Sequence, residues 1–133
     1  MSVRSSTDPL AVAIADRVAA LLVEYTYRAA RERELQDGIE TVLRTSGYRV
    51  EREFQLSARD RPDFFIEGCV AIEVKMRASE SAVPSQLARY ASDRRVKALV
   101  VATPRLSTLT GISGEILGVP VRSAARSGPG LTL

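Results

Sequence analysis

The feature that most constrains the fold is an almost unbroken apolar run at residues 96–103, in which Lys97 is the one charged side chain. A strand that is apolar on both faces has to be buried on both faces, which is typical of a central parallel strand. Other elements must then cover both sides of the sheet. The run therefore predicts an α/β protein built in layers.

Periodicity predicts the elements around this strand. Asp8 and Pro9 are typical of a helix N-cap and first turn, and Gly47 is typical of a helix C-terminus. In chain order, the expected elements are an apolar helix from residue 8, a helix at 31–46, strands at 48–56, 63–66 and 69–76, a helix at 85–94, the strand at 96–103, a helical turn at 113–117 and a strand at 119–122. This order predicts a three-layer α/β sandwich with a central mixed β-sheet.

The length of 133 residues is about that of one domain. We expect one domain at residues 8–123, which includes an extra N-terminal helix at 8–30, with flexible ends at 1–7 and 124–133. Because this helix is apolar on more than one face, we expect it to pack on its own domain and to form a homodimer. Burial in the monomer core alone explains the pattern equally well. The helix is too short and too charged to cross a bilayer, and no signal peptide is expected.

The residue types that the chain lacks narrow its chemistry. It has no histidine, which excludes Ser-His catalysis and imidazole zinc sites. Its single cysteine, Cys69, cannot form an internal disulfide, which suits a reducing cytoplasm. Residues 81–133 hold seven basic and two acidic side chains, a balance of +5, beside an acidic middle segment. This suits a metal site next to a phosphate-binding surface, although arginine-rich codon use explains it equally well.

The residues that bear chemistry lie around a tight turn expected at Glu67-Gly68. Alternation along the following strand places Glu73 and Lys75 on one face, and the turn brings Asp63 beside them. Two carboxylates and a lysine next to buried strands are unfavourable without a compensating ligand. Because carboxylates are hard oxygen ligands, the pattern predicts a Mg²⁺ or Mn²⁺ site. A solvated Glu–Lys surface pair is the alternative.

This motif, in its α-β-β-β-α-β context, resembles the PD-(D/E)XK nuclease superfamily. The resemblance covers residues 31–103 and implies a restriction-endonuclease-like core. The chain adds the long N-terminal helix outside that match. The residues that carry the motif are Pro62 and Asp63, then, after nine residues, Glu73, Val74 and Lys75.

A second match lies on the helix expected at residues 85–94. Gln86 and Tyr90 resemble the Q-x-x-x-Y element of the RecB-like exonuclease branch of that superfamily. At positions i and i+4 they share a helix face, and the resemblance implies that they contact substrate phosphate or base. A packed Tyr90 and a solvated Gln86 are the alternative.

The resemblance implies a cytoplasmic enzyme that hydrolyses phosphodiester bonds of DNA with Mg²⁺ or Mn²⁺, in repair, recombination or restriction. Asp63 and Glu73 would bind the metal, with the backbone carbonyl of Val74. Lys75 would orient or deprotonate the attacking water and stabilise charge in the transition state. The alternative is a catalytically idle nucleic-acid-binding or assembly module on the same fold.

Two assignments around this site stay open. Such nucleases often carry another acid on the helix before the first strand; we favour Glu34 over Asp37 and Glu40, and Gln36 is a polar substitute. Basic side chains near the site are expected to contact the nucleic-acid backbone. The two assigned to this role are Arg61 and Arg89.

Overall fold

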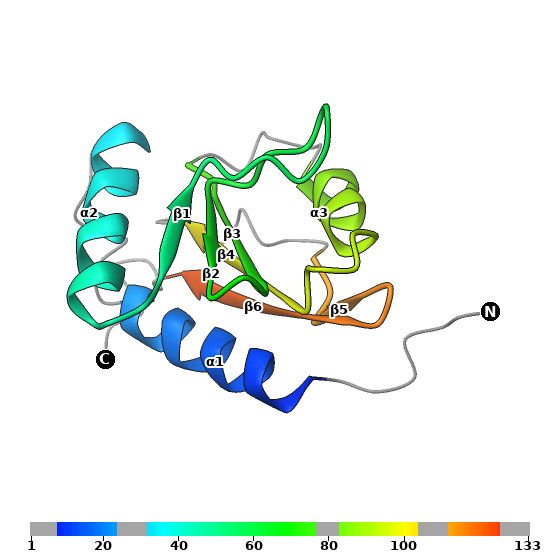
Figure 1. Cartoon of the computed structure of the whole chain (residues 1–133), viewed down its shortest axis with the longest axis horizontal. Coiled ribbons are helices and arrows are strands. Elements are labelled where there is room, and N and C mark those ends of the chain that lie inside the picture. Colours follow the sequence, from blue (N-terminus) through cyan, green and yellow to red (C-terminus); the bar gives the residue numbers. More distant parts are fainter. Residues whose placement is uncertain (1–7, 24–31, 77–82, 104–111, 126–133) are drawn as a thin grey trace, which may run out of the picture.

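A mixed β-sheet with helices on both faces organises the chain (Figure 1). The computed structural model describes residues 8–23, 32–76, 83–103 and 112–125. Those residues form three helices and six strands, and the strand order is β1-β2-β3-β4-β6-β5. The elements are α1 (Pro9–Val23), α2 (Glu32–Thr45), β1 (Val50–Arg52), β2 (Phe64–Ile66), β3 (Val70–Val74), α3 (Val83–Ala91), β4 (Ala98–Thr103), β5 (Glu115–Ile116) and β6 (Val119–Ala125).

Strand β4 lies inside the sheet as the apolar run predicts. It pairs in parallel with β3 on one side and with β6 on the other, and all six of its residues are buried. Strands β1, β2 and β3 form an antiparallel meander at one edge. The mixed sheet and the α/β class are therefore confirmed.

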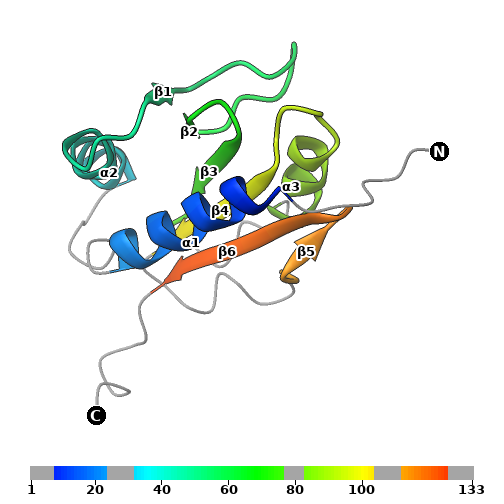
Figure 2. The ribbon, with the colours of Figure 1, turned by 60° about the horizontal axis from the view of Figure 1, so that its bottom comes forward.

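Each face of the sheet has its own apolar core. On one face, α1 and α2 pack on alternate residues of the strands, such as Ile72, Val74 and Val100. On the other face, α3 packs on the intervening residues, such as Ala71 and Val101. Figure 2 shows α1 lying across β4 and β6, with α3 beyond the sheet. The arrangement has three layers, with the sheet in the middle.

Helix α1 begins as expected. The carboxylate of Asp8 accepts hydrogen bonds from the amides of Leu10 and Ala11, at 3.0 Å and 3.2 Å, which caps the first turn. Its buried residues are mostly alanines, which allow a close approach to β4 and β6; they are Ala11, Ala15, Val18, Ala19 and Leu22. Packing on its own domain therefore accounts for the apolar stripe of α1, and the homodimer stays a prediction.

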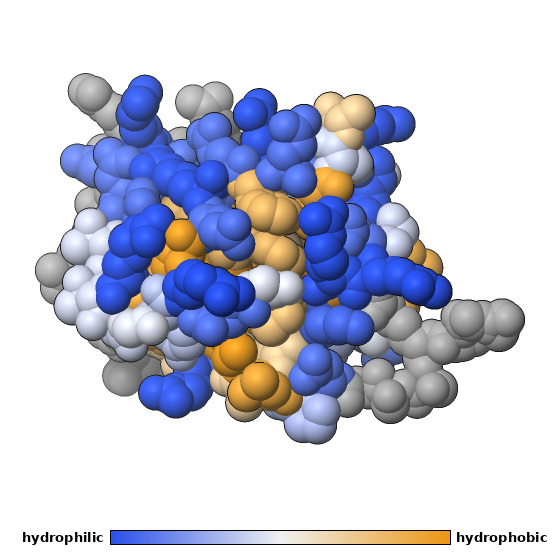
Figure 3. All heavy atoms as spheres, in the orientation of Figure 1, coloured by the Kyte–Doolittle hydropathy of each residue, from blue (hydrophilic) through white to orange (hydrophobic). Residues whose placement is uncertain are grey.

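The outer surface shows where apolar groups remain accessible. Hydrophilic residues cover most of the face in Figure 3, and apolar ones show in a band through its middle. Within the described ranges, the large apolar side chains that are strongly exposed are Leu10, at 69%, and Leu117, at 62%. No helix in those ranges has the length and apolar character needed to cross a membrane.

Replacing Leu22 tests the packing of α1. Because this side chain is fully buried against the sheet, Leu22→Ala should lower the free energy of unfolding by about 2–5 kcal/mol through lost burial and the cavity left behind. Leu10→Ala removes the same atoms from an exposed position of the same helix and should change it by less than about 0.5 kcal/mol. Urea denaturation of both variants measures the difference. Equal effects would mean that α1 does not pack as described.

Three expectations about the elements differ most from the structure. Residues 113–117 do not form a helical turn, because Glu115 and Ile116 pair with β6 in a hairpin. Its two-residue turn has positive φ at Leu117 (52°) and Gly118 (79°), the geometry that hairpins favour. The first strand ends at Arg52 rather than at residue 56. The next residue, Glu53, takes a positive φ of 53°, which interrupts the extended backbone.

The third difference concerns the end of the chain. Strand β6 runs to Ala125, beside β4, so residues 124 and 125 belong to the sheet and not to the expected flexible tail. The other flexible residues expected, 1–7 and 126–133, lie outside the described ranges. So do the end of the first helix predicted at 8–30 and the start of the second at residue 31.

Candidate active site

The β2–β3 hairpin brings Asp63 and Glu73 together. Its turn has positive φ at Glu67 (52°) and Gly68 (67°), as expected for a tight connection. The Phe64–Ile72 pairing places the two acids at adjacent positions where β2 begins and β3 ends. The Asp63 amide donates to the Glu73 carboxylate, and Asp63 Oδ2 accepts from the Val74 amide at 2.7 Å. The two residues are therefore neighbours in the structure, and the convergence of their carboxylates on one ion stays a prediction.

Glu73 is a buried carboxylate surrounded by donors. It is only 5% exposed, on the face of the sheet that α3 covers. Lys75 Nζ lies 3.2 Å from Glu73 Oε2, and the Tyr90 hydroxyl donates to Glu73 Oε1 at 2.9 Å. Burial raises the pKa of the Glu73 carboxyl above its ordinary value, and Lys75 and Tyr90 offset part of this rise.

Tyr90 supports Glu73 from α3. The side chain is 1% exposed, and burial together with the charge of Glu73 raises the pKa of its phenol well above the ordinary value. The hydroxyl therefore keeps its proton at physiological pH and acts as a hydrogen-bond donor. The structure thus matches the packed alternative for Tyr90. A direct contact of Tyr90 with substrate stays a prediction that this burial does not favour.

Removing the Tyr90 hydroxyl should cost stability in a pH-dependent way. Tyr90→Phe deprives a buried carboxylate of one donor, which should lower the free energy of unfolding by about 1–3 kcal/mol. The raised pKa means that ionised Glu73 opposes folding as pH rises through that pKa, so the loss should be largest above it and smaller below. Denaturation of Tyr90→Phe over a pH series measures this, with Tyr48→Phe as the control. A loss that does not vary with pH would contradict the pairing.

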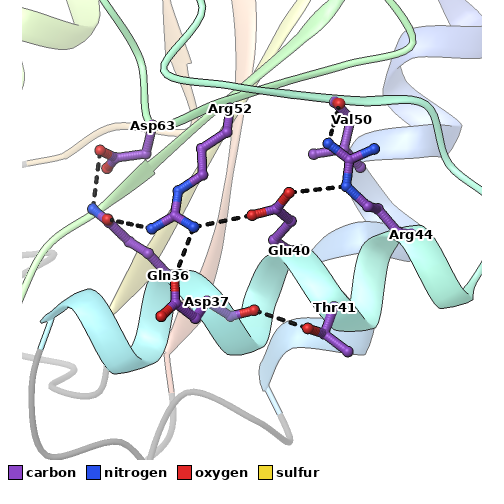
Figure 4. Close-up of polar contacts among 8 residues, drawn as sticks. All are labelled: Gln36, Asp37, Glu40, Thr41, Arg44, Val50, Arg52 and Asp63. Atoms are coloured by element: carbon purple, nitrogen blue, oxygen red, sulfur yellow. Dashed lines mark hydrogen bonds and ion pairs between the residues drawn. The ribbon is translucent and has the colours of Figure 1, made fainter.

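Asp63 is held from the other side by Gln36. This side chain extends from α2, and its Nε2 donates to Asp63 Oδ1 at 3.1 Å. Together with the Val74 amide, it gives each oxygen of the Asp63 carboxylate one donor. Figure 4 shows Gln36 between Asp63 and Arg52.

Two of the three helix acids considered for the site bind an arginine instead. Asp37 Oδ1 and Glu40 Oε1 bind the guanidinium of Arg52 at 2.7 Å and 3.0 Å, and Glu34 is exposed. Gln36, which had been only a polar substitute, is the α2 residue that the structure places on Asp63. A catalytic role for Glu34 stays a prediction.

The side chains expected to contact substrate have different surroundings. Arg61 is exposed, two residues before Asp63, and Gln86 is half-buried on α3. Arg89 forms an ion pair with Asp60 at 2.7 Å. Arg89 therefore holds the loop between β1 and β2 against α3, and its contact with phosphate stays a prediction.

The donor set suits a hard divalent cation. Mg²⁺ in proteins is usually held by one or two carboxylates together with waters and substrate phosphates. Asp63 and Glu73 supply two carboxylates on neighbouring residues where β2 begins and β3 ends. A group of three or more Asp, Glu, Cys or His side chains that could hold a metal is not found within the described ranges. Binding of Mg²⁺ or Mn²⁺ by the two acids stays a prediction.

Comparison with known proteins adds no relative. The chain matches no protein-family model, no curated protein and no solved structure.

Proposed function

We propose that this chain is a Mg²⁺-dependent nuclease of the PD-(D/E)XK type that hydrolyses phosphodiester bonds of DNA. The observation that carries the proposal is that Asp63 and Glu73 are neighbours at the end of one hairpin and that Lys75 pairs with Glu73. The order α2-β1-β2-β3-α3-β4, with β3 and β4 parallel, supports it because it follows the α-β-β-β-α-β order of the family core.

In the proposed site, two acids serve as metal ligands and one lysine supplies positive charge. Asp63 and Glu73 would hold Mg²⁺ or Mn²⁺, together with the backbone carbonyl of Val74. Such an ion would supply a lower pKa for a bound water and polarisation of the scissile phosphate. The Lys75 ammonium orients the attacking water and stabilises the negative charge that grows on the phosphate oxygens. The Tyr90 hydroxyl holds the Glu73 carboxylate in place through its hydrogen bond.

The buried charges favour an active site over a purely structural pair. Enclosing Glu73 and Lys75, whose side chains are 6% and 14% exposed, costs desolvation energy that a well-packed apolar pair would avoid. A site that binds a cation and a phosphate offers a reason for that cost. The alternative of an idle nucleic-acid-binding or assembly module is supported by the internal partners that each carboxylate already has.

A panel of labelled substrates separates the two. The protein is incubated with duplex, single strand, flap, four-way junction and RNA, each with Mg²⁺, Mn²⁺ or EDTA. The nuclease proposal expects cleavage of at least one DNA form that EDTA stops. Retarded migration without cleavage would support the idle module. Neither binding nor cleavage would overturn the nuclease proposal and favour an assembly role.

The expected setting follows from the proposal. Repair, recombination or restriction in the cytoplasm suits a small metal-dependent nuclease, and a homodimer through α1 would allow two strands to be cut together. Arg61 and Arg89 remain the proposed contacts to the DNA backbone.

A further inference from the structure

We propose that Arg52 and Gln36 form a positioning pair that aims the carboxylate of Asp63. The inference rests on the proposed function in so far as the aimed carboxylate is there to bind a cation. Its evidence is a continuous chain of contacts. Arg52 donates from its second terminal nitrogen to Gln36 Oε1 at 3.1 Å, and Gln36 Nε2 donates to Asp63 Oδ1 at 3.1 Å.

Arg52 is itself held firmly. Its first terminal nitrogen lies 2.7 Å from Asp37 Oδ1 and 3.0 Å from Glu40 Oε1, and its guanidinium carbon lies 5.8 Å from the ring centre of Phe64. The planar guanidinium directs its N–H groups in fixed directions. Because two acids of α2 bind the first terminal nitrogen, the second terminal nitrogen faces Gln36, as Figure 4 shows.

The chemistry of the three groups determines the order of the chain. A guanidinium only donates and a carboxylate only accepts, so they are joined through a group that does both. The carboxamide of Gln36 accepts from Arg52 with its oxygen and donates to Asp63 with its nitrogen. An acid at position 36 would accept from Arg52 equally well, but would repel Asp63 instead of holding it. Arg52 thereby sets which end of the carboxamide faces Asp63.

The first test needs no metal. The Val74 amide donates to Oδ2 of the Asp63 carboxylate, whereas Gln36 donates to Oδ1, so the proton chemical shift of that amide reports where the carboxylate lies. Gln36→Met and Arg52→Met should both move this resonance upfield in ¹⁵N-resolved spectra. Asp37→Asn removes one of the two ion pairs of Arg52 but keeps the pair with Glu40. Because Arg52 should stay in place, the Val74 resonance should be nearly unchanged. An unmoved Val74 resonance in Gln36→Met or in Arg52→Met would overturn the proposal.

A conservative substitution of Arg52 distinguishes a positioning role from an effect of its charge alone. Arg52→Lys keeps a cation beside Asp37 and Glu40 and should preserve the fold, but one ammonium cannot hold both acids and Gln36 as a fork does. Its Val74 resonance should therefore resemble that of Arg52→Met. Restoration of the wild-type shift by lysine would mean that Arg52 acts only as a structural charge.

The second test concerns the cation. Groups that hold a ligand in place typically change metal affinity by about 10–100-fold, so Gln36→Met should raise the Kd for Mn²⁺ by that factor in calorimetry. If Arg52 acts through Gln36, adding Arg52→Met to Gln36→Met should weaken binding no further. Full additivity would contradict the relay. Absence of Mn²⁺ binding by the wild type would overturn the proposed function, whereas the Val74 test would still decide on the positioning pair.

Discussion

Lys75→Ala is expected to lower the rate of Mg²⁺-dependent DNA cleavage by at least about 100-fold, because the ammonium is the charged group placed to stabilise the transition state. Its Nζ lies 3.2 Å from Glu73, at the end of β3 where Asp63 also lies. The variant leaves Glu73 buried without its cation. Uptake of a proton by Glu73 limits the resulting loss of stability, and circular dichroism verifies the fold.

Lys97→Ala is the matched control. Lys97 is the other lysine of the chain, and its backbone amide bonds to Cys69 at the opposite end of β3. Its removal should leave the cleavage rate within about twofold, since it lies far along the strand from the acids and general charge contributes little at that distance. Equal losses in both variants would show a general charge effect, and full activity of Lys75→Ala would remove Lys75 from the mechanism.

Asp63→Asn is expected to abolish measurable Mn²⁺ binding. Changes to groups that only support a ligand cost about 10–100-fold in metal affinity, and loss of the ligand's charge should exceed that range. The amide keeps the shape of the side chain and can still accept from Val74. Calorimetric titration with Mn²⁺ measures the change. Cleavage should fall with binding.

Asp60→Asn controls for a carboxylate on the same loop. Asp60 lies three residues before Asp63 and pairs with Arg89, so the substitution changes loop anchoring but not the proposed cation site. Mn²⁺ affinity should stay within about threefold of wild type, as for a change outside the ligand shell. Strong Mn²⁺ binding by Asp63→Asn would mean that the ion is held elsewhere.

The central parts of the fold could be predicted because local patterns determine them. A continuous apolar run permits few environments, and it identified β4 as a buried parallel strand. The Glu67-Gly68 turn and strict alternation along β3 then placed Asp63 and Glu73 together. These inferences needed only the period of a strand and the geometry of a tight turn.

Other features depend on how distant elements meet. Glu34 and Gln36 lie on opposite sides of the buried Leu35 of α2, and the sequence does not reveal which side faces Asp63. Glu115 and Ile116 form a strand because β6 offers a partner, which overrides their weak local preference. The hydrogen bond between Tyr90 and Glu73 was not predicted, although the sequence holds a signal for it. Tyr90 shares the buried side of α3 with Leu87, and Glu73 faces that side of the sheet.

Paramagnetic broadening by Mn²⁺ in ¹⁵N-resolved spectra of the wild-type protein tests the central claim most directly. An ion held by the two carboxylates should first erase the amide resonances of residues 63 and 73–75, where β2 begins and β3 ends. EDTA should restore them. Broadening centred on another acidic group, or none at Mn²⁺ concentrations that support cleavage, would contradict the account.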